Sequence, residues 1–591
     1  MTGFRLIFSI CLLMILGLAC SNENSNPDKQ RPNVLLILTD DQGMGDVGIH
    51  GNDSIETPVQ DQLAREGVRM NFFYVSPVCA PTRASLLTGR YHYRTGTTWM
   101  TRNGEAMRSE EVTLAEVFKA NGYATGCFGK WHNGAHFPQN PLGQGFDTFT
   151  GFSGGQWNRY YDPDLESEGK KTRFKGYITD ILTDAAVDFI SKNKDQPFFA
   201  YLPYNAPHSP FIAPDSLFQK YRQKGLSVRN ASIYGMIESI DTNIGRLLAT
   251  LKELELLENT LVIFMTDNGP NGDRYTMDLR GRKGAVSDGG VRVPCFIYWK
   301  DQLEGGQIIE ELTAHIDILP TLVDLLNLNP ISTLPLDGIS FASLLNGGLD
   351  SLPERNFYTF SVNRNPFKGS VRNRTHRLTV SGEKEFRLTQ WKEDPSEKHD
   401  LKGQSPQLAE AMYHDYLNKY EEVTEELDAF LPIPLGYDEA PEVDLPAHEG
   451  FSQGGLRYKS SSQGWNNDWW VNWTSELDTM YWNIEVASET SYKAFLKYEC
   501  QREYVGSYIH LKVGTEEISA QLTEAFIGET FHNREQLSRG RVADDQTWGE
   551  LALGEIKLSK GSERICLFAS DISNGQVAET KGLRLEKIIR E

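Results

Sequence analysis

Residues 33–41 read Asn-Val-Leu-Leu-Ile-Leu-Thr-Asp-Asp, an unbroken apolar run that ends in two adjacent carboxylates. A run without alternation is typical of a strand buried on both faces, and so of a central strand in a parallel α/β sheet. Ligand sites in such sheets lie at the carboxyl ends of the strands. A solvated turn is the alternative, but two acids after a buried strand favour a cation between them. We therefore predict a metal site at Asp40 and Asp41.

The same arrangement recurs further along the chain. Buried strands are predicted at residues 123–128, 197–204, 260–266 and 294–299, an extended segment at 68–75, and helices at 57–67, 113–120, 180–193 and 233–254. The first three of these strands are followed by Lys130 and His132, by His208, and by Asp267 and Asn268. One such histidine or aspartate is usually structural, but their repetition along one sheet edge indicates a shared site.

Residues 79–89 form a second informative stretch, Cys-Ala-Pro-Thr-Arg-Ala-Ser-Leu-Leu-Thr-Gly. Pro81 suits the first turn of a helix, where unpaired N–H groups and the helix dipole favour an anion. Arg83 lies one turn after Cys79 and can therefore point to the same place. The stretch predicts a reactive side chain and a guanidinium beside an anion, with a buried cysteine in a tight turn as the alternative.

Length, charge and cysteine content restrict the classes of protein. A chain of 591 residues exceeds one ordinary core and suggests two or three domains. The formal net charge of −21 argues against nucleic-acid binding, so an anionic substrate must be held by local cations. The seven cysteines include two in the first twenty residues, and the other five are widely spaced, which is not a disulfide framework. A Cys500–Cys566 pair remains open.

The first twenty residues resemble an export signal. Arg5 is their only charge, an apolar run extends from Leu6 to Leu18, and Gly-Leu-Ala-Cys at 17–20 is similar to a bacterial lipoprotein box. We expect Cys20 to become a lipidated N-terminus in the periplasm or at the cell surface, with 21–30 as a polar tether. A plain cleaved signal is the alternative.

The end of the chain changes character after about residue 431. The proline-rich, acidic stretch 432–446 is predicted to be a linker, and short alternating runs in 447–591 predict a β-sandwich. This part is similar to the jelly-roll modules of glycan-active enzymes. Its tryptophans suit sugar binding or core packing, and both readings remain open; they are Trp465, Trp469, Trp470, Trp473 and Trp482.

The chain resembles the type I, formylglycine-dependent sulfatases of the alkaline phosphatase superfamily, especially bacterial polysaccharide and aryl sulfatases. The resemblance covers about residues 31–430. It rests on 33–41 with Gly43, 79–89, 129–132, 206–208, 266–269, 281–284 and 289–294, and more weakly on 371–372, 377–378, 394–395 and 400–401. It implies an α/β catalytic domain (31–355) with a central, mostly parallel sheet, and a small C-terminal α+β subdomain (356–431).

The resemblance also implies the chemistry of the site. Cys79 would be oxidised by a formylglycine-generating or radical maturase to 3-oxoalanine (formylglycine), whose hydrate is the nucleophile. One divalent cation, usually Ca²⁺, would be bound by four oxygen ligands and the modified residue. The implied ligands are Asp40, Asp41, Asp267, Asn268 and modified Cys79.

The remaining roles are carried over from matching positions. Arg83 matches the arginine that holds the formylglycine hydroxyl, and Lys130 and Lys283 match lysines that grip sulfate oxygens. His208, with Lys283 beside it, matches the acid that assists departure of the alcohol. This role needs a protonated imidazole, which neighbouring anions would favour. His132 matches the base that later expels sulfate.

Two segments depart from the family pattern: Asn133 follows His132, and 286–288 reads Val-Ser-Asp. We expect both to touch the substrate pocket rather than the reacting atoms. The substrate itself should be bound by variable loops, through arginines that pair with anions and aromatic rings that stack on sugars. The candidates, each also readable as an ordinary surface residue, are Arg94, Arg102, His136, Trp157, Arg159 and Tyr160. Ser153 is similar in position to a serine of the family that touches sulfate.

These observations favour an exported enzyme that hydrolyses sulfate esters on a sulfated polysaccharide or its oligosaccharides. A phosphodiester or phosphonate hydrolase of the same superfamily, a small-molecule arylsulfatase, and a glycan-binding lipoprotein on an inactive scaffold are the alternatives.

Overall fold

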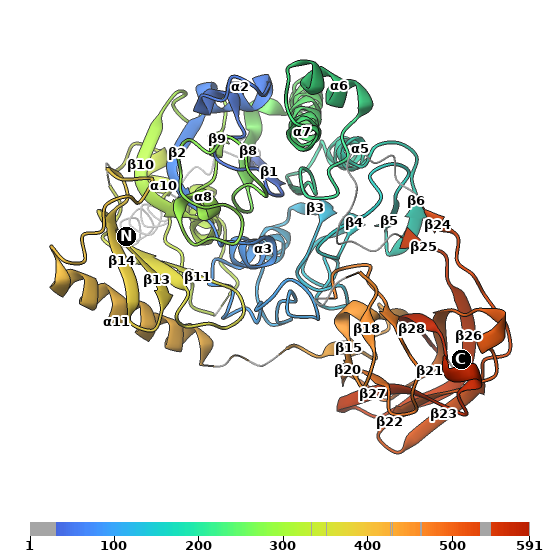
Figure 1. Cartoon of the computed structure of the whole chain (residues 1–591). Coiled ribbons are helices and arrows are strands. Elements are labelled where there is room, and N and C mark those ends of the chain that lie inside the picture. Colours follow the sequence, from blue (N-terminus) through green and yellow to red (C-terminus); the bar gives the residue numbers. More distant parts are fainter. Residues whose placement is uncertain are drawn as a thin grey trace, which may run out of the picture.

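The computed structural model describes residues 31–589 except 333, 350, 426, 428–429, 461–463 and 532–544. The predicted export signal, Cys20 and the tether lie outside the described residues. Figure 1 shows a large α/β body and, beside it, a smaller body built from strands. No helix in the described ranges combines the length and apolar character needed to cross a bilayer.

A ten-stranded sheet runs through the large body. Its central strands are parallel, while β9 and the far edge are antiparallel. The order is β10 (Ile308–Ala314), β2 (Val68–Tyr74), β9 (Cys295–Tyr298), β8 (Thr260–Thr266), β1 (Asn33–Thr39), β7 (Phe198–Pro203), β3 (Ala124–Lys130), β4 (Thr148–Phe152), β5 (Asp164–Ser167) and β6 (Lys170–Arg173).

Strand β1 separates two hydrophobic cores because its side chains alternate between the faces of the sheet. Val34, Leu36 and Leu38 pack on one face, while Leu35 and Ile37 pack on the other. The first core includes residues of α3 (Cys79–Thr88), α4 (Leu114–Ala120), α9 (Ile318–Leu325) and α10 (Ala342–Leu345); the second includes α2 (Pro58–Glu66), α5 (Ile178–Lys192) and α7 (Val228–Glu253). Helix α6 (Asp215–Gln223) packs on α7. The expected α/β sandwich is confirmed.

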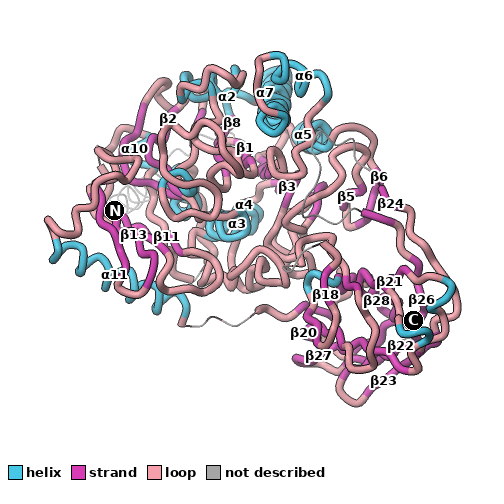
Figure 2. Tube along the Cα trace, in the orientation of Figure 1, coloured by secondary structure: helices cyan, strands magenta, loops and turns pink. Residues whose placement is uncertain are grey.

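Local sequence signals place most element boundaries. The predicted strand at 260–266 matches β8, and the predicted helix at 57–67 matches α2, with a proline in its first turn. Thr113 and Glu116 form a reciprocal capping box at α4. The predicted strand at 294–299 forms, but as the antiparallel β9. Long helices are confined to the larger body (Figure 2).

A small subdomain covers the edge of the sheet. Its four antiparallel strands are β11 (Phe357–Phe360), β12 (Gly369–Arg372), β13 (His376–Gly382) and β14 (Glu385–Gln390), and α11 (Pro406–Thr424) packs on them. Asp288, in α8 (Asp288–Val291), forms buried ion pairs with Arg372, at 3.0 Å, and with Arg377. Burial opposes ionisation, but the two arginines hold the pKa of Asp288 below its usual value. This cluster joins the subdomain to the catalytic sheet.

The smaller body is a β-sandwich, which we call the accessory sandwich (433–589). One sheet contains β15 (Ile433–Leu435), β20 (Thr479–Val486), β27 (Gly561–Ser570), β22 (Tyr508–Val513) and β23 (Glu516–Gln521), with β17 (Phe451–Gln453) paired to β20. The other contains β18 (Arg457–Tyr458), β19 (Trp470–Val471), β28 (Glu579–Lys587), β21 (Thr490–Glu499) and β26 (Gly549–Leu558), with β16 (Glu442–Pro446) paired to β28. Strands β24 (Thr530–Phe531) and β25 (Asp545–Gln546) form a separate pair.

Two expectations about this region change. Residues 432–446 do not form a free linker, because β15 and β16 within them each pair with a sandwich strand. Cys500 and Cys566 are not joined: both are free thiols, on strands of opposite sheets or directly after them.

The tryptophan cluster divides into two groups. Trp469, Trp470, Trp473 and Trp482 are at most 4% exposed and belong to the sandwich core, so core packing explains them. Trp465 is half-buried and stands apart from that core.

Asp288→Asn is expected to destabilise the fold by roughly 3–5 kcal/mol, because it leaves Arg372 buried without a counter-charge. The measurement is the urea midpoint of unfolding. Asp195→Asn, at an exposed aspartate after α5, is the control. Equal midpoints for Asp288→Asn and the control would contradict the proposed cluster.

Candidate active site

The carboxyl ends of four neighbouring strands bring the predicted polar residues to one edge of the sheet. Strands β8, β1, β7 and β3 are adjacent and parallel. These ends carry Asp40 and Asp41 after β1, Lys130 at the end of β3, His208 after β7, and Asp267 and Asn268 after β8.

Arg83 and Lys130 neutralise two of the carboxylates. Lys130 Nζ donates to Asp40 Oδ2 at 2.6 Å, and the Arg83 guanidinium donates to Asp267 Oδ2 at 2.8 and 3.1 Å. Arg83 Nη1 also donates to the Lys130 carbonyl oxygen at 2.6 Å. All four side chains are fully buried, so Arg83 links helix α3 rigidly to the ends of β8 and β3.

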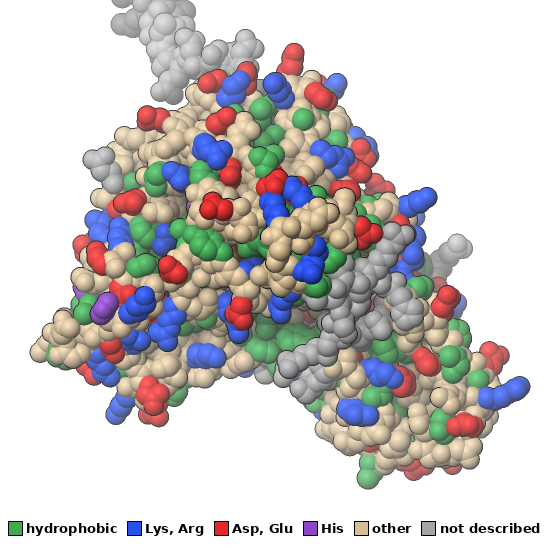
Figure 3. All heavy atoms as spheres, turned by 45° about the horizontal axis from the view of Figure 1, so that its top comes forward, with side chains coloured by type: hydrophobic (Ala, Val, Ile, Leu, Met, Phe, Trp, Pro, Cys, Tyr) green, Lys and Arg blue, Asp and Glu red, His purple; other side chains and the backbone are tan. Residues whose placement is uncertain are grey.

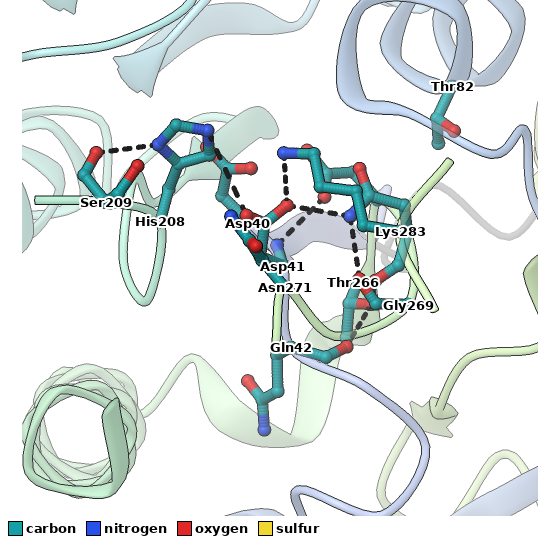
Figure 4. A network of polar contacts seen from close by, with 12 residues as sticks. Asp40, Asp41, Gln42, Thr82, His208, Ser209, Thr266, Gly269, Asn271 and Lys283 are labelled. Carbon is teal, nitrogen blue, oxygen red and sulfur yellow. Dashed lines mark hydrogen bonds and ion pairs between the residues drawn. The ribbon is translucent and has the colours of Figure 1, made fainter. Parts of the chain in front are cut away.

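Asp41 has a different set of neighbours. Lys283 Nζ and Asn268 Nδ2 both donate to Asp41 Oδ1, the latter at 2.7 Å. His208 Nε2 lies 3.9 Å from Asp41 Oδ2. In Figure 4, His208 and Lys283 approach Asp40 and Asp41 from opposite sides. Lys283 is 16% exposed and His208 14%, so both reach the mouth of the site.

The buried oxygen atoms fit a divalent cation. Asp40 Oδ1, Asp41 Oδ2 and Asn268 Oδ1 are buried and have no hydrogen-bond partner. Such acceptors are costly unless a cation or another donor compensates them. Two groups of residues could each hold a cation, because the possible ligand atoms within each group lie within 4.8 Å of one another. One group is Asp40, Asp41 and His208, and the other is Asp40, Cys79 and Asp267. Hard oxygen ligands suit calcium or magnesium.

The three buried carboxylates differ in their pKa values because they have different charged neighbours. Burial alone would raise all three pKa values, but the neighbouring positive charges together outweigh it at Asp40, where Lys130 contributes most, and at Asp41, where Lys283 contributes most, so both pKa values are lowered. Burial together with the charge of Asp40 raises the pKa of Asp267 to about 7. A cation at this site would favour ionisation of all three.

Cys79 is the first residue of α3 and is 2% exposed. Burial raises the pKa of its thiol, although Lys130 and Lys283 oppose this. A protonated, buried thiol is a poor nucleophile. Cys79 therefore lies at the centre of the basic and acidic groups but is unsuited to act as a cysteine.

The two histidines differ in their hydrogen bonds. His208 Nδ1 lies 2.7 Å from the Ser209 carbonyl oxygen and donates to it, so Nε2 faces Asp41. Burial and the charge of Lys283 lower the pKa of His208, contrary to the expectation that its neighbouring anions would dominate. His132 Nε2 donates to the Met100 carbonyl oxygen at 3.1 Å, which leaves Nδ1 as a lone-pair acceptor, buried and without a partner. Burial and Lys130 hold the pKa of His132 well below its usual value.

Three residues support the site in ways that the sequence did not predict. Arg274 pairs with Asp46 and donates to the Asp41 carbonyl oxygen at 2.7 Å, which supports the left-handed backbone of Asp41 (φ 70°). Asn133 donates to the Ala80 carbonyl oxygen at 3.0 Å and so supports the start of α3. Tyr160, a substrate candidate, donates instead to the His208 carbonyl oxygen at 2.7 Å.

The departures from the family pattern therefore have structural partners. Asn133 is fully buried against α3, and Asp288 pairs with the subdomain, which gives no support to the predicted substrate contacts.

Three substrate candidates have other surroundings. Arg94 is neutralised by Asp337, at 3.0 Å, and by Glu422, which gives no support to the predicted substrate contact. Trp157 stacks on Phe152. Ser153 Oγ is buried without a partner, and its carbonyl oxygen accepts from the His132 backbone at 3.1 Å.

The other three candidates reach the accessory sandwich. His136 Nε2 lies 2.6 Å from Glu449 Oε2 in a buried pair. The Arg102 guanidinium lies 5.7 Å from the centre of the Tyr458 ring. Arg159 pairs with Asp164 and lies 3.5 Å over the ring of Phe531, where Figure 1 shows β24 close to β6.

Residues 32–328 match the sulfatase family profile, half of the chain. The chain belongs to the sulfatase family. The sulfatase is 33% identical to N-acetylgalactosamine-6-sulfatase of Sus scrofa over 384 residues, covering 58% of this chain and 71% of the relative. It is 30% identical to steryl-sulfatase of Mus musculus over 429 residues, covering 56% and 67%. It is therefore a sulfuric ester hydrolase.

Solved structures agree with this assignment. The crystal structure of Ps i-CgsB in complex with k-i-k-neocarrahexaose is 28% identical, with a TM-score of 0.62, and the match covers 67% of this sulfatase and 95% of that chain. PsFucS1 sulfatase from Pseudoalteromonas sp. is 26% identical, with a TM-score of 0.57 and coverage of 68% and 92%. Each is matched almost completely, so about a third of this sulfatase has no counterpart in them.

Asp41→Ala is expected to abolish binding of the divalent cation that the family implies, because it removes a ligand and a bond to Asn268. Elemental analysis should find about one equivalent of metal in the wild type and little in the variant. Calcium at 100-fold above its dissociation constant should stabilise the wild type by about 2.7 kcal/mol. A similar thermal shift in Asp41→Ala would contradict the assigned ligands; Asp195→Ala is the control.

The His136–Glu449 pair gives stability a defined pH dependence. Burial opposes both charges, but each partner outweighs it, so the pKa of His136 is raised above 6.5 and that of Glu449 is lowered below 4.5. The histidine contribution is complete below pH 6.5 and is lost as pH rises through its folded pKa. The glutamate contribution is present above pH 4.5 and is lost as pH falls through its folded pKa. The pair therefore contributes most between pH 4.5 and 6.5.

His136→Gln should lower stability by roughly 3–5 kcal/mol in that window, because Glu449 is left buried and unpaired. The loss should shrink at pH 9, where the wild-type histidine is also neutral. Thermal unfolding of wild type and variant across this pH range measures it. A loss independent of pH would indicate packing alone.

Proposed function

We propose that this sulfatase removes sulfate esters from a sulfated polysaccharide or its oligosaccharides, using formylglycine made from Cys79. The observation that carries the proposal is the convergence of Cys79, two lysines and two histidines on one cluster of buried carboxylates. The enzyme structure solved with k-i-k-neocarrahexaose, a carbohydrate ligand by its name, supports a glycan over a small aryl ester.

The proposed cation ligands are Asp40, Asp41, Asp267 and Asn268, whose donors are all oxygen, and calcium is the proposed ion. Bound there, it supplies Lewis-acid polarisation of the sulfate and of the nucleophile. The fixed pairs from Lys130 and Arg83 hold two of these carboxylates in place before any ligand binds.

Cys79 is proposed to be the precursor of the nucleophile. Oxidation by a maturase would convert its side chain to formylglycine, which supplies a hydrated aldehyde at this position. The raised pKa of the thiol supports this role, because unmodified Cys79 would stay protonated. Arg83, anchored by Asp267 and by the Lys130 carbonyl oxygen, would orient the modified side chain.

Lys130 and Lys283 would bind the sulfate oxygens and oppose the charge that develops during transfer. Each is already bonded to a carboxylate, Lys130 to Asp40 and Lys283 to Asp41, so their positions are set before substrate enters. Aspartate oxygens fix the lysines without filling all three donor positions of each ammonium group.

Proton transfer would use the two histidines. His208 presents Nε2 to the site, and an incoming sulfate anion would raise its pKa toward the protonated form needed to donate to the leaving alcohol. Burial opposes the charge of Lys283, but Asp41 and the other neighbouring acidic groups together raise its pKa, so Lys283 stays protonated beside His208. His132, with Nδ1 available as an acceptor, is the proposed base for the later release of sulfate.

Export to the periplasm or cell surface, with a lipid anchor at Cys20, completes the proposal. Figure 3 shows acidic and basic side chains interspersed over one face of the molecule, and the formal net charge is −21. An anionic glycan would therefore be bound by local arginines and lysines rather than by the overall field.

Hydrolysis of phosphonates or phosphodiesters is the second candidate function, and the shared fold is its support. The phosphonate monoester hydrolase of Agrobacterium radiobacter shares the fold, with a TM-score of 0.51 at 22% identity. The sulfatase relatives favour sulfate, and small aryl sulfates form the third substrate class.

Wild type and Cys79→Ala should be compared on sulfated algal and animal oligosaccharides, an aryl sulfate, and phosphate mono- and diesters. We expect sulfate release from some oligosaccharides by the wild type and loss of at least 1000-fold in the variant, because its nucleophile is gone. Circular dichroism of both proteins tests that the fold is kept. Mass spectrometry of the Cys79 peptide tests for formylglycine.

Equal sulfate release by Cys79→Ala would refute the mechanism. Faster hydrolysis of phosphate diesters than of any sulfate would favour the second candidate. Activity on aryl sulfates alone would remove the glycan assignment.

A further inference from the structure

A cavity of about 500 Å³ lies where the accessory sandwich meets the catalytic body. Its walls come from distant parts of the chain: Trp99 and Arg102 from the catalytic domain, Arg364 from the small subdomain, and Trp465 from the sandwich. The other lining residues are Thr98, Asn363 and Phe430. This volume is within the range of small-ligand sites.

One wall of the cavity is connected to the catalytic centre through residue 100. The Met100 carbonyl oxygen accepts a bond from His132 Nε2 at 3.1 Å, and Trp99 and Arg102 flank it in the chain. Thr101 Oγ1, in the same segment, donates to the Gly464 carbonyl oxygen at 2.6 Å. This segment therefore touches the proposed catalytic base on one side and the accessory sandwich on the other.

The sandwich segment that carries Trp465 also contacts a loop beside His132. Asn466 Nδ2 donates to the Gln156 carbonyl oxygen. A Cβ on Gly154 would lie 2.5 Å from Asn466, and one on Gly155 would lie 2.4 Å from His132 Nε2. Gly154 therefore packs against the accessory sandwich at Asn466, next to Trp465, while the following residue, Gly155, packs against His132.

The lining suits an anionic sugar. Arginine forms bidentate pairs with sulfate or carboxylate, and indole rings pack on the apolar face of a pyranose. Arg364 is exposed, and Trp465 is half-buried and outside the sandwich core that accounts for the other four tryptophans. The cavity thus combines both kinds of recognition, and one of its walls comes from the segment whose Met100 carbonyl oxygen binds His132.

We propose that this cavity is a subsite for a second, anionic sugar unit of the glycan whose sulfate ester lies at Cys79. The proposal rests on the proposed glycan function and extends it. The accessory sandwich is then part of the substrate-binding surface, through Trp465, rather than an independently attached binding module. About a third of this chain has no counterpart in the two solved structures. We therefore expect the subsite to give this sulfatase a substrate specificity that differs from theirs.

The test uses Arg364→Ala and Trp465→Phe or Trp465→Ala in the full-length enzyme. The readout is the ratio of kcat/KM for a sulfated tetrasaccharide to kcat/KM for an aryl sulfate, which is too small to span both sites. We expect this ratio to fall about tenfold in Arg364→Ala, mainly through KM, equivalent to one lost charge-assisted interaction. Trp465→Phe should lose less than Trp465→Ala, because it keeps a ring for stacking.

Arg502→Ala, at an exposed arginine of the sandwich helix η5 (Arg502–Tyr504) outside the cavity, is the control and should leave the ratio unchanged. Tetrasaccharides that carry a second sulfate, a uronate or neither distinguish the anion bound. The neutral one should show the smallest effect of Arg364→Ala.

If the wild type is active on oligosaccharides and the ratio of the two kcat/KM values is the same in Arg364→Ala as in the control, the subsite is refuted and the glycan function stands. If Trp465→Ala lowers stability but leaves the ratio of the two kcat/KM values unchanged, Trp465 has a packing role only and does not bind the sugar. No sulfate release by the wild type from any oligosaccharide would overturn both proposals.

Discussion

The structure of the site depends on compensating buried negative charge. Asp40, Asp41 and Asp267 lie within one pocket at the carboxyl edge of the sheet, where their burial is unfavourable unless each has a partner. Lys130, Lys283 and Arg83 supply these partners from β3, from the loop after β8 and from α3. The same pairs fix the positions of the cations that the proposed reaction needs, so stability and pre-organisation have one origin.

This arrangement also leaves several polar atoms of the site without hydrogen-bond partners. Oxygen atoms of Asp40, Asp41 and Asn268 are unsatisfied around one position, and His132 Nδ1 is unsatisfied at another. By contrast, the carbonyl oxygens of Ala80, Asp41 and His208 each accept a hydrogen bond from a side chain. Unsatisfied groups gathered at a functional centre are where a cation and substrate would contribute most.

The junctions between the three parts rely on similar buried charges. Asp288 binds the small subdomain through Arg372 and Arg377, and His136 binds the accessory sandwich through Glu449. Both junctions border the active site, because α8 follows the loop that carries Lys283 and His136 follows His132 by four residues. The segments that dock the outer parts therefore also carry residues of the site.

The sequence by itself determined the central parallel strands of the sheet and the identity of their strand-end residues. Continuous apolar runs specify buried strands, and parallel strands must present their carboxyl ends on one edge, so Asp40, Lys130, His208 and Asp267 could be placed together. Tertiary structure decided the rest. The orientation of His208, the burial of Asn133, the structural pairing of Arg94 and the cavity beside Trp465 all depend on contacts between residues far apart in the chain. Hydrophobic periodicity is local and can be read from neighbours, whereas the docking of loops and domains is set by packing and charge pairing that appear only once the chain has folded.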